Sequence, residues 1–142
     1  MTTKILVIDD DTAVTDLLSV LLRSNGFEVL ATNSSGDGLT YARQNEPDLI
    51  ILDLMMPEMD GWEVCRSVRT FSQVPIIVLS ALNDPSMVAS VLDSGADDYL
   101  TKPTPSRILV AHINRLLRRN VTGSLDIPPA KSNILTKPLP AS

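Results

Sequence analysis

Five short apolar runs, each followed by a segment with helical periodicity, are the feature that most restricts how this chain can fold. The runs lie at residues 4–8, 27–31, 49–52, 76–79 and 99–100. They are largely continuous rather than alternating, which is typical of parallel strands covered by helices on both faces. Strands that alternate strictly with helices favour right-handed crossovers and one doubly wound parallel sheet.

The segments between these runs have the spacing of amphipathic helices. The first, capped by Asp11 or Thr12 and ending at Asn25–Gly26, has an apolar stripe at i, i+3, i+4, i+7 and i+8, which predicts a helix with this face toward the core. The stripe consists of Val14, Leu17, Leu18, Leu21 and Leu22. The fourth helix is predicted to start at residues 84–85, and we expect it to bury Val88, Val91 and Leu92.

Five strand–helix units predict an α/β fold of the flavodoxin-like (βα)5 type, with strand order 2-1-3-4-5. In such a sheet a crevice opens where the first and third strands separate. The 142 residues are enough for one domain, which we expect at residues 1–119, ending with the last predicted helix. Residues 120–142 contain four prolines and few large apolar side chains, so we expect a flexible proline-rich tail or linker there.

Composition and charge exclude several classes of function. The formal net charge is −5, which argues against direct nucleic-acid binding by this domain, because such binding depends on basic residues that neutralise phosphates. No segment approaches the ~20 apolar residues that a membrane span needs, and no signal-peptide pattern precedes the first strand. The single cysteine, Cys65, rules out an internal disulfide and is expected to be a small buried side chain. These features together predict a cytoplasmic protein with no membrane contact.

Polar residues of complementary chemistry follow four of the five predicted strands. Asp9 and Asp10 follow the first strand, Asp53 the third, Ser80 the fourth and Lys102 the fifth. Because the carboxyl ends of parallel strands meet at one edge of a sheet, we expect these five side chains to lie close together. Each of them alone is compatible with an ordinary loop, helix cap or surface residue. Their joint placement at one edge favours a functional site.

The chemistry of this set indicates a phosphoryl site with a metal ion. Two carboxylates ~4 Å apart repel by about 4 kcal/mol at an effective dielectric constant of about 20, so that a group of three must protonate or bind a cation. Hard oxygen ligands with open positions for water suit Mg²⁺ better than Ca²⁺ or zinc. A phosphoryl group on Asp53 would also use the ammonium group of Lys102 and the hydroxyl of Ser80.

Other phosphate-binding classes lack their residues in this sequence. The chain contains no G-x-x-x-x-G-K-[ST] loop, and no G-x-G-x-x-G follows the first strand, which excludes a P-loop NTPase and a dinucleotide site. A haloacid-dehalogenase-type phosphatase would need a second aspartate at position 55, where this chain has Met55. A flavin-binding flavodoxin would need a hydroxyl-rich loop after the first strand, where this chain has aspartates that repel phosphate.

Four segments resemble the signatures of response-regulator receiver domains of bacterial two-component systems. They read KILVIDDD, PDLIILDLMMPEMDGWE, PIIVLSA and GADDYLTKP, and the resemblance extends from residue 4 to about 119. It implies that Asp53 accepts a phosphoryl group from a sensor histidine kinase or a phosphotransfer protein. It also implies a signalling protein whose only chemistry is its own phosphorylation and dephosphorylation. The output would be a shift of the face formed by the fourth helix, fifth strand and fifth helix.

The resemblance assigns metal ligands. Asp10 would bind Mg²⁺ directly and Asp9 mostly through water. Asp53 and the backbone carbonyl of Met55 would supply further ligands.

The resemblance also assigns the residues of the switch. Lys102 would contact the phosphoryl group. Ser80 would move its hydroxyl toward this group while the ring of Tyr99 turns inward behind it. The Lys102–Pro103 peptide bond is expected to be cis.

The chain resembles the OmpR-like branch of this family, but it departs from that branch on the face used for dimerisation. A basic residue is expected where Ser90 stands, a glutamate where Ile108 stands and an arginine where His112 stands; Asp97 alone keeps the expected charge. We therefore expect either a different partner or an apolar homodimer contact on this face. The sequence leaves open whether residues 120–142 end the protein or lead to a DNA-binding output domain.

An alternative from another functional class is a pseudo-receiver that serves as a constitutive protein-interaction module and is never phosphorylated. The complete set of acidic residues, together with Ser80 and Lys102, argues against this alternative.

Overall fold

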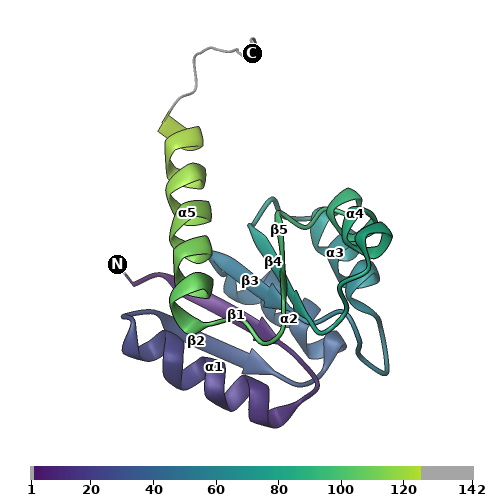
Figure 1. The fold of residues 1–142 in the computed structure, drawn as a ribbon. Helices are drawn as coiled ribbons and strands as arrows, with labels where there is room; N and C mark the ends of the chain where they lie inside the picture. The colour runs from purple at the N-terminus through teal and green to yellow at the C-terminus, as the bar shows by residue number, and fades with distance from the viewer. Residues whose placement is uncertain (1, 126–142) are drawn as a thin grey trace.

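The computed structural model describes residues 2–125 and shows a five-stranded parallel sheet between two layers of helices (Figure 1). The strands are β1 (Lys4–Ile8), β2 (Glu28–Thr32), β3 (Leu49–Leu52), β4 (Ile76–Ser80) and β5 (Asp98–Thr101). Their order in the sheet is β2-β1-β3-β4-β5, and all neighbours are parallel. The flavodoxin-like (βα)5 fold expected from the sequence is thereby confirmed.

Five helices alternate with these strands. They are α1 (Thr12–Ser24), α2 (Ser35–Asn45), α3 (Gly61–Arg69), α4 (Pro85–Asp93) and α5 (Ser106–Leu125). Several begin with a side chain that caps the first turn, as Asp11 does by accepting a hydrogen bond from the backbone N–H of Ala13 at 2.9 Å. Within residues 2–125, no helix is both long and apolar enough to span a lipid bilayer.

The strands separate two apolar cores because successive side chains point to opposite faces of the sheet. On one face Ile5, Val7 and other strand residues pack against α1 and α5, including Leu22 and Ile113. On the other face Leu6, Ile8 and further strand residues pack against α2, α3 and α4. Cys65 of α3 belongs to this second core and is fully buried, as expected. The continuous apolar strands are explained by this double coverage.

The orientation of α1 differs from the sequence prediction. Leu17 was expected on the buried stripe but is 69% exposed, while the small polar residues Thr15 and Ser19 face the sheet together with Leu18 and Leu22. The helix is therefore rotated about its axis relative to the predicted stripe. Thr15 can be buried because its hydroxyl donates a hydrogen bond to the backbone carbonyl of Thr12.

Two other expectations about helices need correction. Leu92 of α4 is 41% exposed, and of the three residues expected to be buried there only Val91 is fully buried. Helix α5 continues to Leu125 instead of ending at Arg119. Most of the predicted tail, residues 126–142, lies outside the described part of the chain.

Candidate functional site

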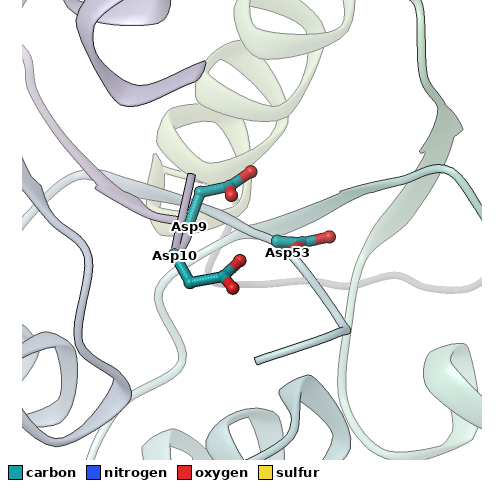
Figure 2. A group of neighbouring side chains, drawn as sticks. All are labelled: Asp9, Asp10 and Asp53. Carbon is teal, nitrogen blue, oxygen red and sulfur yellow. The ribbon is translucent and has the colours of Figure 1, made fainter. Parts of the chain in front are cut away.

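Three aspartates meet at the carboxyl end of the central strands. Asp9 and Asp10 follow β1 and Asp53 follows β3, and these two strands are neighbours in the sheet. The backbone N–H of Asp53 donates to the carbonyl of Ile8 at 3.0 Å, which fixes the relative height of the two strand ends. One carboxylate oxygen from each aspartate lies within 4.8 Å of the other two. Figure 2 shows the three carboxylates pointing to the same side of the strand ends.

The three carboxylates differ in their exposure to solvent. Asp9 is 3% and Asp53 is 7% exposed, whereas Asp10 is exposed. A buried carboxylate loses hydration that stabilises its charge, and this burial is the main cause that raises the pKa of Asp53.

Lys102 supplies positive charge to this cluster. Its Nζ donates a hydrogen bond to Asp9 Oδ2 at 2.8 Å and lies 3.7 Å from Asp53 Oδ1. Partial burial lowers the pKa of Lys102, but the hydrogen bond to Asp9 and the negative charges of Asp53, Asp9 and Asp11 together raise it by more, so that the net pKa lies above its usual value. The ammonium group is therefore held in its charged form between two aspartates.

Asp53 remains difficult to ionise despite this neighbour. Burial, followed by the charge of Asp9, raises the pKa of Asp53 from 3.8 to about 6, although Lys102 opposes the shift. Asp10 contributes further repulsion. In the described part of the chain, the cluster is thus short of positive charge, and a bound cation would relieve this shortage.

The carboxylate of Asp9 is already engaged at both oxygens. Oδ1 accepts a hydrogen bond from the backbone N–H of Asp11 at 2.9 Å, and Oδ2 accepts one from Lys102. Among the described residues, no hydrogen bond reaches the carboxylate of Asp10. Asp10 and Asp53 therefore offer the freer oxygen atoms of the three.

The backbone of Leu82 joins Ser80 and Tyr99. Ser80 is fully buried at the end of β4, and its Oγ accepts a hydrogen bond from the N–H of Leu82 at 3.3 Å. The phenol of Tyr99, in β5, donates to the carbonyl of the same residue. The side chain of Met55, two residues beyond Asp53, is 58% exposed. The cis peptide bond expected at Lys102–Pro103 is confirmed.

The structure adds one polar side chain that the sequence analysis missed. Asn33 directly follows β2, and its Nδ2 donates to the backbone carbonyl of Asp9 at 2.7 Å and to Thr15 Oγ1 at 3.1 Å. The signal for it was available, because Asn33 is the polar residue at the carboxyl end of the one strand that contributes no predicted site residue.

Comparison with known proteins identifies the family. The family model described as "Response regulator receiver domain" matches residues 5–114. This chain is a response-regulator receiver domain. It is 46% identical over 123 residues to the transcriptional regulatory protein AfsQ1 of Streptomyces coelicolor, a match that covers 87% of this chain and 55% of AfsQ1. It is 44% identical over 120 residues to the DNA-binding response regulator MtrA of Mycobacterium tuberculosis, covering 84% of this chain and 53% of MtrA.

Solved receiver structures have the same fold. A two-component response regulator from Clostridium difficile superimposes with a TM-score of 0.81 at 32% identity, over 84% of this chain and 98% of that chain. The BeF3-activated DrrB receiver domain gives a TM-score of 0.77 at 33% identity, over 84% and 100% of the two chains. The receiver domain spans about half the length of the curated relatives it matches. The predicted family and its class, a two-component signalling protein, are confirmed.

Proposed function

We propose that Asp53 accepts a phosphoryl group from a sensor histidine kinase or a phosphotransfer protein. A carboxylate oxygen of Asp53 attacks the phosphorus and forms a new P–O bond. The bond from phosphorus to the donor atom breaks, and the leaving group departs with the electron pair. The observation that supports this step is the acidic cluster itself, in which Asp53 lies beside Asp9, Asp10 and the Lys102 ammonium group.

The donor set fits Mg²⁺. Asp9, Asp10 and Asp53 offer only carboxylate oxygens, which are the ligands that this ion prefers, and the raised pKa of Asp53 reflects an excess of negative charge. Asp10 and Asp53 would bind the ion directly, Asp9 through water, and the backbone carbonyl of Met55 would add a ligand. When bound, Mg²⁺ supplies positive charge that offsets the charge of the phosphoryl oxygens.

Lys102 places a positive charge close to the position that the negatively charged phosphoryl oxygens would occupy. Its Nζ is 3.7 Å from Asp53 Oδ1, so that a small movement away from Asp9 brings it to a phosphoryl group on Asp53. This is how Lys102 would contact the group, as an ammonium ion already desolvated in part and oriented by the fold.

Ser80 and Tyr99 would form the switch through Leu82. In this structure the Ser80 hydroxyl accepts a hydrogen bond from the N–H of Leu82, and this bond would break when the hydroxyl turns toward the phosphoryl group. The loop then moves, and Tyr99 loses its carbonyl partner on the same residue and turns inward. Phosphorylation would thus shift the population of conformations of the face formed by α4, β5 and α5.

This face would contact a partner or a second copy of the chain. Ile108 and Leu92 are 42% and 41% exposed there, whereas Asp97 and Asp98 are paired with basic residues of the same chain. An apolar homodimer contact is therefore our proposal in place of intermolecular ion pairs. It predicts that Ile108→Lys abolishes a dimer measured by analytical ultracentrifugation with a phosphoryl mimic, and an unchanged dimer contradicts it.

We also propose a domain arrangement for the chain. Residues 1–119 would form the phosphoacceptor domain of a cytoplasmic regulator, and residues 120–142 a tail or linker. The relatives AfsQ1 and MtrA are named as a transcriptional regulatory protein and a DNA-binding response regulator, which supports a DNA-binding output domain in the whole protein.

Incubation with acetyl phosphate and Mg²⁺ tests the phosphoacceptor. Intact-protein mass spectrometry is expected to show a gain of one phosphoryl group in the wild-type protein and in Asp93→Asn, which removes an exposed carboxylate at the end of α4. No gain is expected in Asp53→Asn. A wild-type protein that remains unmodified would support the pseudo-receiver alternative, and a modified Asp53→Asn protein would place the phosphoryl group elsewhere.

A further inference from the structure

We propose that Asn33 is a positioning residue for Asp10, which it directs toward Mg²⁺ by fixing the peptide group between Asp9 and Asp10. The inference rests on the proposed function, because it concerns the use of Asp10 as a metal ligand. The observation behind it is the pair of hydrogen bonds from Asn33 Nδ2, at 2.7 Å to the carbonyl of Asp9 and at 3.1 Å to Thr15 Oγ1.

The directions of these hydrogen bonds follow from their partners. The carbonyl of Asp9 can only accept a hydrogen bond. The hydroxyl of Thr15 gives its proton to the carbonyl of Thr12 at 3.1 Å, so that it too accepts from Asn33. Both partners therefore require the NH₂ group of the amide, which has two protons to donate. Only one of the two orientations of the Asn33 amide satisfies this arrangement.

Asp10 depends on this contact more than the other two aspartates do. The carbonyl of Asp9, the N–H of Asp10 and the Cα of Asp10 belong to one planar peptide group, so that holding the carbonyl fixes the point from which the Asp10 side chain leaves the backbone. Asp9 has side-chain anchors in Asp11 and Lys102, and Asp53 directly follows a strand of the sheet. Asp10 is exposed, and its orientation comes from the backbone.

Thr15 connects the same contact to the first turn of α1. It is 4% exposed, and its hydroxyl lies between the amide of Asn33 and the carbonyl of Thr12, where the helix begins. Asn33 thus ties the end of β2 to the turn that carries Asp10 and to the start of α1. Groups that orient metal ligands through hydrogen bonds typically change metal affinity by about 10- to 100-fold when they are removed.

Calorimetric titration with Mg²⁺ tests the inference. Asn33→Leu keeps a side chain of similar size but removes both donors, and it is expected to raise the Mg²⁺ dissociation constant about tenfold or more. Thr15→Val removes only the second acceptor and is expected to cause a smaller rise. The matched control is Ser34→Ala, because the hydroxyl of Ser34 accepts from the backbone N–H of Asp37 and bonds to Glu58, and makes no hydrogen bond to Asp9 or Thr15. This control is expected to lower the melting temperature and to leave the dissociation constant unchanged.

A second measurement follows Asp10 without metal. In ¹H–¹⁵N spectra of the metal-free protein, Asn33→Leu is expected to shift the backbone amide of Asp10, whereas Ser34→Ala leaves it in place. If Asn33→Leu binds Mg²⁺ as tightly as the wild type, Asn33 has no positioning role, although the metal site itself stands. If the wild-type protein does not bind Mg²⁺, the proposed metal site and this inference both fail.

Discussion

Two groups of aspartates lie on this domain, one at the carboxyl ends of β1 and β3 and one at the start of β5. In the first, the carboxylates of Asp9, Asp10 and Asp53 lie close to one another, and among the described residues one ammonium group, that of Lys102, lies beside Asp9 and Asp53. In the second, Asp97 and Asp98 are each paired with two basic side chains. Asp97 pairs with Arg69 and Arg119, and Asp98 with His112 and Arg115.

This difference in charge balance distinguishes the candidate functional site, at the ends of β1 and β3, from the structural ion pairs at the start of β5. The aspartates at the start of β5 are satisfied within the chain, so that they hold α3, β5 and α5 together. The cluster at the carboxyl end keeps unbalanced negative charge, as the raised pKa of Asp53 indicates. Removing one charged group from each region should therefore change stability in opposite directions.

The largest expected effect is the loss of Arg69. Its guanidinium donates to the backbone carbonyls of Gly95, Ser72 and Val74 and to Asp97 Oδ2, at 2.7–3.2 Å. Arg69→Met keeps the aliphatic stem but removes the donor from the three carbonyls and leaves Asp97 Oδ2 with only the backbone N–H of Ile76. We therefore expect a loss of about 3 kcal/mol in the free energy of unfolding.

Urea denaturation measures this effect, with Arg66→Met as the control on an exposed position of the same helix. A loss below about 1 kcal/mol would show that the basic residues around Asp97 are no more structural than an ordinary surface pair.

Removing the charge of Asp53 is expected to raise the free energy of unfolding. The pKa of Asp53 is about 6 in the folded protein and ordinarily 3.8, so that between these two pH values the unfolded chain ionises while the folded protein keeps the proton. The penalty to the metal-free fold therefore builds up over this range and is fully present above pH 6. Asp53→Asn removes this penalty, and we expect the variant to be more stable than the wild type by about 2 kcal/mol at pH 7.5 without metal.

The advantage of Asp53→Asn should shrink as the pH falls from 6 toward 4, because the wild-type carboxyl group then takes up its proton in the folded state. Urea denaturation at several pH values, with EDTA present, measures this difference. A difference that is independent of pH would mean that Asp53 is not the group responsible.

The fold could be predicted from the sequence because it depends on patterns that extend over whole elements. The apolar runs at 4–8 and 49–52 match β1 and β3 residue for residue, and alternation with helices determined the strand order. The approach of Asp9 to Asp53 follows from that order, since both residues directly follow neighbouring parallel strands.

What could not be predicted depends on polar groups whose partners are distant in sequence. The exposed Leu17 follows from the burial of Thr15, whose hydroxyl is satisfied by Thr12 and by Asn33. Hydrophobicity alone predicts that Leu17 is buried in preference to Thr15, so the apolar pattern of the sequence does not reveal how α1 is rotated about its axis. Helix α5 passes the predicted domain end at residue 119, and the sequence has no proline between residues 106 and 127 that would stop it.

The smallest effect is expected from the loss of Arg119. Arg119 is the second basic partner of Asp97, at 3.1 Å, but its side chain is 63% exposed. Solvent screens such a pair, and Arg69 remains bound to the other oxygen of Asp97, so Arg119→Ala should cost no more than about 0.5 kcal/mol. A loss as large as that of Arg69→Met, measured in the same urea experiment, would mean that both basic partners are required. Asp97 would then depend on every one of its basic partners, as Asp9 depends on Lys102. The aspartates at the start of β5 would no longer differ from the carboxylate cluster by having more positive charge than they need.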